Sequence, residues 1–244
     1  MFTPIVHILM LISSFFSILT TITYVIFKKH RTFQLKLIVY LCYSLCIQYL
    51  FVVLSFSFKA GSEVCIGNSI VHHYFYLNVI LWNTCVAFNF YQVFIKNNKD
   101  AENYEIYYHL IVYGIPFIDC LFNAIKRNYG VVSDHCSIVG DLWYILGLYV
   151  PGLICFVVNM TIYIVLSFKI GYILKNTPAT YRKDKSKELK VHLSIFVSTG
   201  ILGFVSFLIT FIAYFSKNSI LYWFFYNLCL PLEVEEVGLF ILLL

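Results

Sequence analysis

The sequence predicts an all-α, polytopic membrane protein, a bundle of seven transmembrane helices. Three observations support this fold class: apolar stretches of about 20 residues, short polar gaps between them, and a scarcity of charge. Of the 244 residues, 61% are hydrophobic and only 12% are charged, whereas soluble proteins carry about 25% charged residues. So few charged side chains could not cover a water-facing surface, so lipid surrounds most of the chain. No polar stretch is long enough for a separate soluble domain, and residues 1–244 are interpreted as a single domain, one helical bundle.

The spans are placed by length, because a helix that rises about 1.5 Å per residue needs about 20 residues to cross roughly 30 Å of hydrocarbon. The first apolar segment is followed, not preceded, by its basic residues, so it is interpreted as a helix and not as a signal peptide. The predicted spans lie near residues 4–27, 35–58, 69–95, 106–125, 142–168, 191–215 and 219–240. The seventh is atypical, because carboxylates fall near its inner third.

Basic residues set the expected orientation. If the N-terminus is outside, the predicted outer loops contain few of the 17 basic residues, namely Lys59, Lys126, Arg127 and Lys217. Basic residues favour the cytoplasmic side. We therefore expect an integral protein of the plasma membrane, with an extracellular N-terminus and cytoplasmic basic loops. The longest inner loop carries Arg182, Lys183 and Lys187, which would anchor the chain on anionic lipid or also dock a cytoplasmic partner.

Motifs of enzymes and cofactor-binding proteins are missing. The sequence contains no HExxH, no pair of CxxC motifs, no Walker loop and no GxSxG. His72 and His73 are adjacent and point about 100° apart on a helix, so they cannot share a metal as an i, i+4 pair does. No lysine lies in the seventh segment, where retinal would be attached. The sequence therefore predicts no enzyme, no metal or cofactor, and no nucleic-acid partner.

Two of the eight cysteines fall near predicted outer loops. Cys65 lies at the outer end of the third segment, and Cys136 lies in the second outer loop. Both would face an oxidising compartment, where a disulfide would tie this loop over the mouth of the bundle. The alternative is two unrelated thiols. The other six cysteines lie within apolar segments, where a thiol packs as a small hydrophobe, so we favour the bond.

The third segment is unusually polar. His72, Tyr76 and Asn83 share one helical face, and Asn78 and Asn89 share another. A helix that is polar on two faces is expected to be surrounded by other helices. Asn78 and Asn89 are interpreted as forming hydrogen bonds between helices. His72, Tyr76 and Asn83 either do the same or line a ligand pocket.

Asp119 is the only carboxylate well inside the first six segments. It lies about two helical turns from the predicted outer end, so its burial is costly without being prohibitive. Lys126 and Arg127 follow on the same face of an extended helix and would neutralise it. The alternative role for Asp119 is to bind a ligand.

Two prolines lie in apolar parts of predicted helices. Pro116 and Pro151 each remove a backbone hydrogen bond and should bend their helices. Bent helices open cavities, which suits a receptor or a transporter. A small transporter or channel is the second interpretation, although matching halves that would indicate inverted repeats are not found.

Several motifs follow one another in a fixed order between residues 65 and 160. They are Cys65, Trp82, Ala87-Phe88-Asn89, Tyr113-Gly114-Ile115-Pro116, Tyr129-Gly130, Cys136 and Tyr149-Val150-Pro151. Their order and spacing resemble the cyclic-AMP receptors of slime moulds and their fungal and amoebal relatives, within the G protein-coupled receptor superfamily.

The resemblance implies a receptor that senses an extracellular small molecule and activates a heterotrimeric G protein, with Cys65–Cys136 as the family's outer disulfide. Ligand would favour a state in which the sixth helix has moved outward. The ligand's identity does not follow from the resemblance. The residues proposed for the pocket are His72, Tyr76, Asn83 and Asp119, and those proposed for G protein coupling are Lys96, Arg182, Lys183 and Lys187.

The C-terminal sequence departs from this family pattern. After Pro231 the family's seventh helix would continue as an apolar stretch, whereas this chain has Glu233, Glu235 and Glu236. A truncated, non-signalling receptor remnant is therefore the third interpretation.

Overall fold

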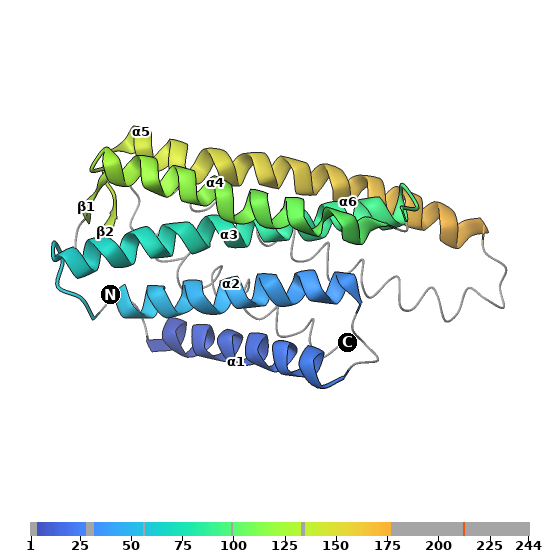
Figure 1. Ribbon diagram of the computed structural model, residues 1–244, viewed down its shortest axis with the longest axis horizontal. Coiled ribbons are helices and arrows are strands. Elements are labelled where there is room, and N and C mark those ends of the chain that lie inside the picture. The colour runs from blue at the N-terminus through green and yellow to red at the C-terminus, as the bar shows by residue number, and fades with distance from the viewer. Residues whose placement is uncertain are drawn as a thin grey trace. The chain divides into compact units, whose positions relative to one another are not determined.

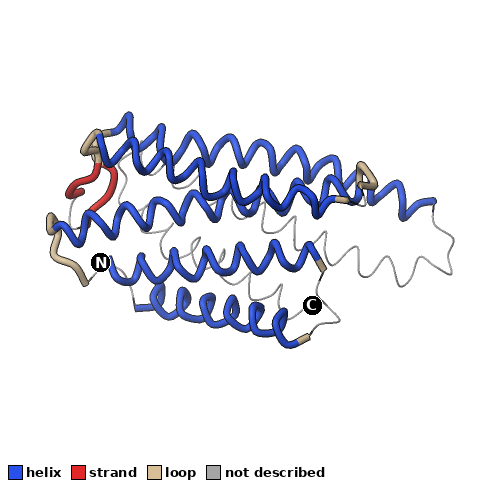
Figure 2. Tube along the Cα trace, in the orientation of Figure 1, coloured by secondary structure: helices blue, strands red, loops and turns tan. Residues whose placement is uncertain are grey.

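The computed structural model describes residues 4–27, 32–55, 57–98, 100–132, 135–176 and 212. Most of these residues are helical, and two short strands interrupt the helices (Figures 1 and 2). In chain order the elements are α1 (Pro4–Ile26), α2 (Phe33–Ser55), α3 (Glu63–Phe94), the 3₁₀ turn η2 (Ala101–Tyr104), α4 (Glu105–Ile125), β1 (Tyr129–Val132), β2 (His135–Ile138), α5 (Asp141–Tyr144), the π-helical turn η3 (Ile145–Tyr149) and α6 (Val150–Asn176).

Among the described residues, four helical segments are long and apolar enough to cross a membrane. They are Phe33–Ser55, Glu63–Phe94, Ala101–Ile125 and Asp141–Lys169, and α1 adds a shorter apolar stretch at Ser14–Ile26. The second to fifth predicted spans are thus confirmed as long apolar helices. The third begins at Glu63 and not near residue 69. Of the predicted spans 191–215 and 219–240, only residue 212, which is helical, is described.

The connection between α4 and α5 contains an antiparallel hairpin that the all-α prediction missed. Tyr129 pairs with Ile138, and Val131 pairs with Cys136. At Gly130 an added Cβ would lie 2.7 Å from a methyl carbon of Val139, so a larger residue would require this exposed side chain to move. Strands of four residues are too short to show a clear alternation of apolar and polar residues, which is why the sequence did not reveal them.

The chain divides into two compact units. One comprises the described parts of Met1–Phe16, Ala87–Lys99 and Phe156–Leu244, and the other comprises those of Ser17–Val86 and Asp100–Cys155. In the first unit, Ala87, Ile162 and Leu166 form a buried apolar cluster. The side chains packed against this cluster are Phe88, Phe90, Tyr91, Phe94 and Ile95.

The second unit is built around Trp82 of α3, which is completely buried. Its ring centroid lies 5.1 Å from that of Tyr40 on α2 and 5.2 Å from that of His109 on α4. Tyr113, one turn further along α4, is stacked on His109 and lies 6.1 Å from Trp82. The indole therefore joins three helices through ring contacts of the kind that stabilise buried aromatic clusters.

An ion pair lies beside this aromatic cluster. The Lys36 ammonium on α2 lies 2.7 Å from Glu105 Oε1 on α4, and the Tyr40 hydroxyl donates to the same oxygen at 3.0 Å. The His109 ring reaches this carboxylate at 3.6 Å. Since both charged side chains remain partly exposed, the pair is expected to contribute no more than about 1 kcal/mol. The buried indole is therefore the stronger link between α2 and α4.

Asn78 and Asn89 are buried, as predicted for a helix surrounded by others, with 0% and 1% of their surfaces exposed. Neither side-chain amide has a hydrogen-bond partner among the described residues. The interhelical hydrogen bonds predicted for them are therefore not found in this part of the chain. Buried amides usually need a partner, which can be an ordered water molecule.

Replacing Trp82 by alanine should destabilise the protein by about 3–5 kcal/mol, because a large cavity would remain among three helices. The measurement is the midpoint of thermal unfolding of the purified protein in detergent. The matched control is Phe117→Ala on α4, since the Phe117 ring is exposed. A similar loss in both variants would contradict the packing role assigned to Trp82.

Candidate functional site at the disulfide-linked hairpin

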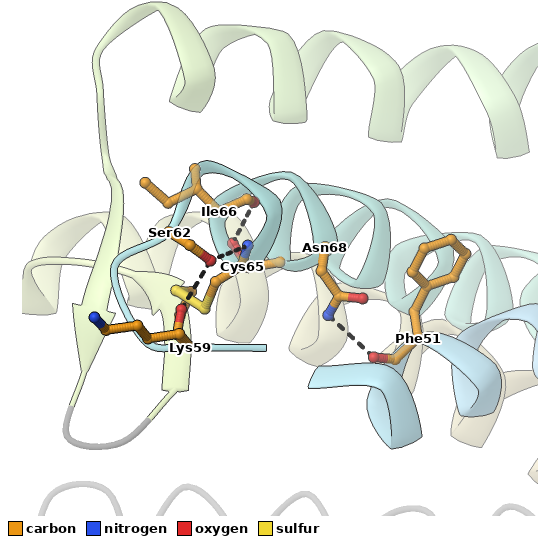
Figure 3. The surroundings of a disulfide bond; sticks show 8 residues. Phe51, Lys59, Ser62, Cys65, Ile66 and Asn68 are labelled. Atoms are coloured by element: carbon orange, nitrogen blue, oxygen red, sulfur yellow. Dashed lines mark hydrogen bonds between the residues drawn. A yellow bond between two sulfur atoms is a disulfide. The ribbon is translucent and has the colours of Figure 1, made fainter. Parts of the chain in front are cut away.

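The hairpin is attached to the start of α3 by a disulfide between Cys65 and Cys136 (Figure 3). Ser62 caps α3: its hydroxyl accepts from the Cys65 N–H at 3.2 Å and donates to the Lys59 carbonyl at 2.8 Å. This cap satisfies one of the free N–H groups at the helix start and fixes Cys65 in the first turn. The Cα atoms of the two cysteines are 5.7 Å apart, a usual disulfide separation. The predicted bond is confirmed.

The end of α4 leads directly into the hairpin. Arg127 adopts a positive φ of 56°, and its N–H donates to the Ala124 carbonyl, while the Asn128 N–H donates to the Asn123 carbonyl. These two bonds form a Schellman motif, which ends a helix by satisfying its last carbonyls. The Asn128 side chain also donates to Asn123 Oδ1 at 3.0 Å. The chain therefore leaves α4 in a fixed direction, and the next residue is Tyr129.

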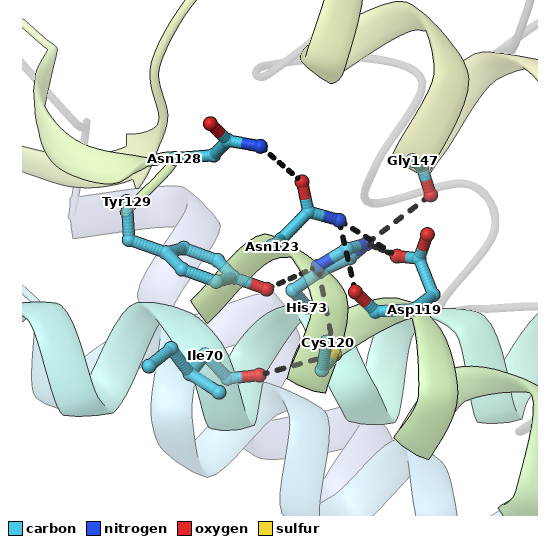
Figure 4. Close-up of polar contacts among 8 residues, drawn as sticks. All are labelled: Ile70, His73, Asp119, Cys120, Asn123, Asn128, Tyr129 and Gly147. Atoms are coloured by element: carbon cyan, nitrogen blue, oxygen red, sulfur yellow. Dashed lines mark hydrogen bonds and ion pairs between the residues drawn. The ribbon is translucent and has the colours of Figure 1, made fainter. Parts of the chain in front are cut away.

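His73 of α3 is the centre of a buried polar cluster (Figure 4). Only 3% of its surface is exposed. Its Nδ1 lies 2.8 Å from the Tyr129 hydroxyl, and its Nε2 lies 3.1 Å from the Gly147 carbonyl oxygen and 3.4 Å from Asp119 Oδ2. The Cys120 sulfur lies 3.6 Å from Nδ1. Residues of α3, α4, β1 and η3 thus meet at one imidazole.

These partners determine which ring nitrogen carries the proton. A carbonyl oxygen can only accept, so Nε2 of His73 holds the hydrogen that it donates to Gly147. Nδ1 of the neutral ring is then an acceptor, and it receives the hydrogen bond from the Tyr129 hydroxyl. Burial raises the pKa of Tyr129 above its usual value, so the phenol remains protonated and able to donate.

The Gly147 carbonyl is suited to accept the hydrogen bond from His73 because a proline follows four residues later. Pro151 lacks the N–H that would otherwise pair with the carbonyl four residues earlier, which is that of Gly147. This carbonyl lies in the π-helical turn η3, a wider turn that is often found at functional sites. A Cβ at Gly147 would already lie 3.5 Å from both His73 Cε1 and Asp119 Oδ2. An alanine Cβ would therefore make an ordinary contact, whereas a larger side chain would be crowded against the cluster.

Asp119 is held by its own helix as well as by His73. The Asn123 side chain donates to the Asp119 carbonyl at 3.0 Å and to Oδ2 at 3.3 Å. Lys126 and Arg127 were predicted to neutralise Asp119, but the structure shows no ion pair between either of them and this carboxylate. The carboxylate instead lies beside the neutral ring of His73, with Oδ2 3.4 Å from Nε2, and the Lys126 ammonium lies over the ring of Phe122 at 6.0 Å from the ring centroid.

Of the four residues predicted to bind ligand, Asp119 belongs to this cluster. His72, Tyr76 and Asn83 are half-buried on α3, and the histidine found beside Asp119 is His73. From the sequence alone, His73 was distinguished only as the neighbour of His72 and was not among the residues predicted to bind ligand. Cys120 and Gly147, which also contact His73, were not predicted either. Nothing in the sequence indicates that these two residues lie beside that histidine.

Of the residues predicted to contact a G protein, the structure describes Lys96. Lys96 follows the end of α3, is exposed, and has its ammonium 6.0 Å from the centroid of the Tyr91 ring. Arg182, Lys183 and Lys187 lie outside the described residues.

The cluster also contains residues that are able to hold a metal ion. His73, Asp119 and Cys120 each offer one ligand atom, and these three atoms lie within 4.8 Å of one another. Both ring nitrogens of His73 already have hydrogen-bond partners, the Tyr129 hydroxyl and the Gly147 carbonyl. The cluster as it stands therefore connects helices and the hairpin, and its imidazole is not available as a base.

Long apolar helices and a disulfide-linked hairpin define a polytopic integral membrane protein. The family described as slime mold cyclic AMP receptor matches residues 3–229 of this chain. The chain belongs to this family, and the resemblance inferred from its motifs is confirmed.

Curated relatives agree with this assignment. The chain is 38% identical over 192 residues to latrophilin receptor-like protein A of Dictyostelium discoideum, covering 78% of this chain and 62% of the relative. It is 26% identical over 156 residues to cyclic AMP receptor-like protein A of the same organism, covering 62% and 40%. It is 26% identical over 132 residues to G-protein coupled receptor 1 of Arabidopsis thaliana, covering 52% and 40%. The chain thus spans less than two thirds of the length of each.

Removing the disulfide by the double substitution Cys65→Ala and Cys136→Ala should lower the stability of the protein. The bond joins residues separated by 71 positions, for which the chain-entropy estimate is up to roughly 4 kcal/mol. The measurement is thermal unfolding with and without a reductant. The control replaces the free thiols Cys85 and Cys155 by alanine. If reductant destabilised the double variant as much as the parent, another disulfide would have to be responsible.

Replacing Gly147 by valine should destabilise the protein by about 1–3 kcal/mol, because the added methyl groups would overlap His73, Asp119 or Ile138. The matched control is Gly114→Val on α4, where an added Cβ meets nothing within 4 Å. Thermal unfolding of both variants checks the difference. Equal effects would show that helix propensity, and not the close approach at Gly147, determines the result.

Proposed function

We propose that the chain forms a single seven-transmembrane receptor domain over residues 1–244 at the cell surface. In this proposal it senses an extracellular small molecule and activates a heterotrimeric G protein. The observation that carries the proposal is the family match over residues 3–229, and the four membrane-capable helices support it. Two relatives bear the names cyclic AMP receptor-like protein and G-protein coupled receptor.

The proposed orientation places the disulfide-linked hairpin outside the cell and the N-terminus with it. Two independent arguments support this side. Disulfides form and persist in oxidising compartments, and Cys65 and Cys136 are joined. Most basic residues of the chain also fall in the predicted loops on the side opposite to the hairpin, and basic loops favour the cytoplasm.

We propose that the ligand binds near His72, Tyr76, Asn83 and Asp119. The Asp119 side chain is 28% exposed, so part of its carboxylate is open to a ligand. This set contains a carboxylate and no lysine or arginine. It therefore suits a ligand that offers a hydrogen-bond donor or a positive group, whereas a phosphate in contact with Asp119 would be repelled.

The mechanism follows from the contacts of Asp119. A ligand that engages this carboxylate competes with its contact to His73, and His73 in turn holds the Gly147 carbonyl of η3. Ligand would shift the receptor between two arrangements of these elements, by as much as its affinities for the two arrangements differ. On the cytoplasmic side, Lys96, Arg182, Lys183 and Lys187 are proposed to contact the G protein.

G protein activation in cells that express the chain tests the proposal, first without ligand and then with small compounds that carry a positive group or a hydrogen-bond donor. We expect Lys96→Glu to lower activation several-fold, because it places a negative charge on the proposed coupling surface. Lys59→Glu is the matched control: Lys59 is also exposed and lies before α3, on the proposed outer side. Antibody labelling of an N-terminal tag on intact cells measures surface expression and orientation.

Equal losses from Lys96→Glu and Lys59→Glu, at equal surface expression, would contradict the proposed coupling surface. A second version, with a complete seventh helix and cytoplasmic tail grafted on, separates two outcomes. Activity from the grafted version alone would mean that residues 1–244 by themselves are not sufficient for signalling. Silence of both at the cell surface with a range of compounds would favour the transporter interpretation.

A further inference from the structure

We propose that His73, Asp119 and Cys120 form a binding site for a zinc-class transition metal ion. The ligand atoms of the three side chains lie within 4.8 Å of one another. His73 Nδ1 and the Cys120 sulfur are 3.6 Å apart, and two ligands at about 2.0 and 2.3 Å from one tetrahedral zinc are about 3.5 Å apart. This pair is therefore already at the separation that a shared ion requires.

The second ring nitrogen of His73 is held in the way that metal-bound histidines are held. Its Nε2 donates to the Gly147 carbonyl at 3.1 Å, which fixes the ring orientation and leaves the lone pair on Nδ1. A histidine that binds a metal usually donates its other N–H to a carbonyl or carboxylate in this manner. The tautomer required for coordination through Nδ1 is thus the one that the structure contains.

Asp119 and Cys120 complete the donor set: although these two residues are adjacent on α4, their ligand atoms lie within 4.8 Å of each other and of the ligand atom of His73. The thiol of Cys120 is buried and donates weakly to the Ile70 carbonyl at 3.9 Å. The Asp119 carboxylate, with 28% of its side chain exposed, is the most adjustable of the three ligands. It provides a path by which an ion and a coordinating water can enter. Three protein ligands and one water make up the usual four-coordinate open site.

The donor atoms select the kind of metal. Calcium and magnesium are bound by oxygen ligands, whereas a set of imidazole, thiolate and carboxylate suits zinc and its neighbours. On binding, a bond forms between the ion and the Cys120 sulfur, and the thiol proton is released to solvent. Nothing in this step requires an oxidant or a reductant.

Tyr129 would have to give way when the metal binds. The lone pair of Nδ1 now accepts the Tyr129 hydroxyl at 2.8 Å, and one lone pair cannot serve both the hydroxyl and an ion. Metal binding therefore replaces a contact between α3 and the hairpin by a link between α3 and α4. The Cys65–Cys136 disulfide would keep the hairpin attached in either state.

Zinc binding by the full chain, purified in detergent and stripped with a chelator, tests the proposal. We expect one ion per chain by elemental analysis after dialysis. Cobalt in place of zinc should give the charge-transfer absorption of a thiolate ligand and the visible bands of a tetrahedral site. No ligand or G protein is needed, so failure here leaves the proposed receptor function untouched.

Substitutions identify the site. Cys120→Ala and Asp119→Asn should each weaken zinc binding by more than about 100-fold, since even outer-shell changes at metal sites cost about 10–100-fold. Asp119→Asn retains every cysteine and nearly the same shape, so it remains informative if Cys120→Ala folds poorly. Cys155→Ala, which removes another buried thiol, is the matched control and should bind zinc as the parent does.

Tyr129→Phe distinguishes exchange from simple addition. Removing the hydroxyl frees Nδ1 of His73, so zinc affinity should rise several-fold, the equivalent of one net hydrogen bond. A fall in affinity would overturn the exchange with Tyr129. The site itself would be overturned if the parent bound no stoichiometric zinc, or if Cys155→Ala weakened binding as much as Cys120→Ala.

Discussion

Burying an imidazole in apolar surroundings is costly unless both of its ring nitrogens have hydrogen-bond partners. His73 satisfies this requirement with groups from β1 and η3, and Asp119 and Cys120 of α4 lie against the same ring. Each of these elements must therefore be placed correctly for the histidine to be tolerated. The position of the hairpin is thus a condition for burying a side chain inside the second unit.

Local features of the chain deliver these partners. The Schellman motif at the end of α4 points the chain toward β1, and Tyr129 is the first residue of that strand. Pro151 leaves the Gly147 carbonyl without its usual donor. The small residue at position 147 leaves the space uncrowded, because a side chain larger than alanine would press on His73 and Asp119. The Schellman motif, Pro151 and Gly147 are separate local features of the chain, and together they place the partners of His73 in one polar cluster.

The disulfide and the polar cluster hold the hairpin in two different ways. The covalent bond limits how far Cys136 can move from the start of α3, whereas the contact between Tyr129 and His73 can be broken at the cost of one hydrogen bond, about 1 kcal/mol net. A loop that is permanently attached yet able to change its inner contact is suited to respond to a molecule or an ion bound beneath it. This combination connects the proposed ligand site and the proposed metal site with the family's role as receptors.

The sequence by itself determined the membrane environment, four long apolar helices among the described residues, and the pairing of Cys65 with Cys136. Each depends on composition, segment length or the compartment that a residue faces, all of which can be counted along the chain. The tertiary structure alone decided that His73, and not the adjacent His72, lies beside Asp119. One residue changes the helical direction by about 100°, and the partners of His73 lie 46 to 74 residues away. Contacts over such separations depend on how helices pack and rotate against one another, and no periodicity in the sequence records that rotation.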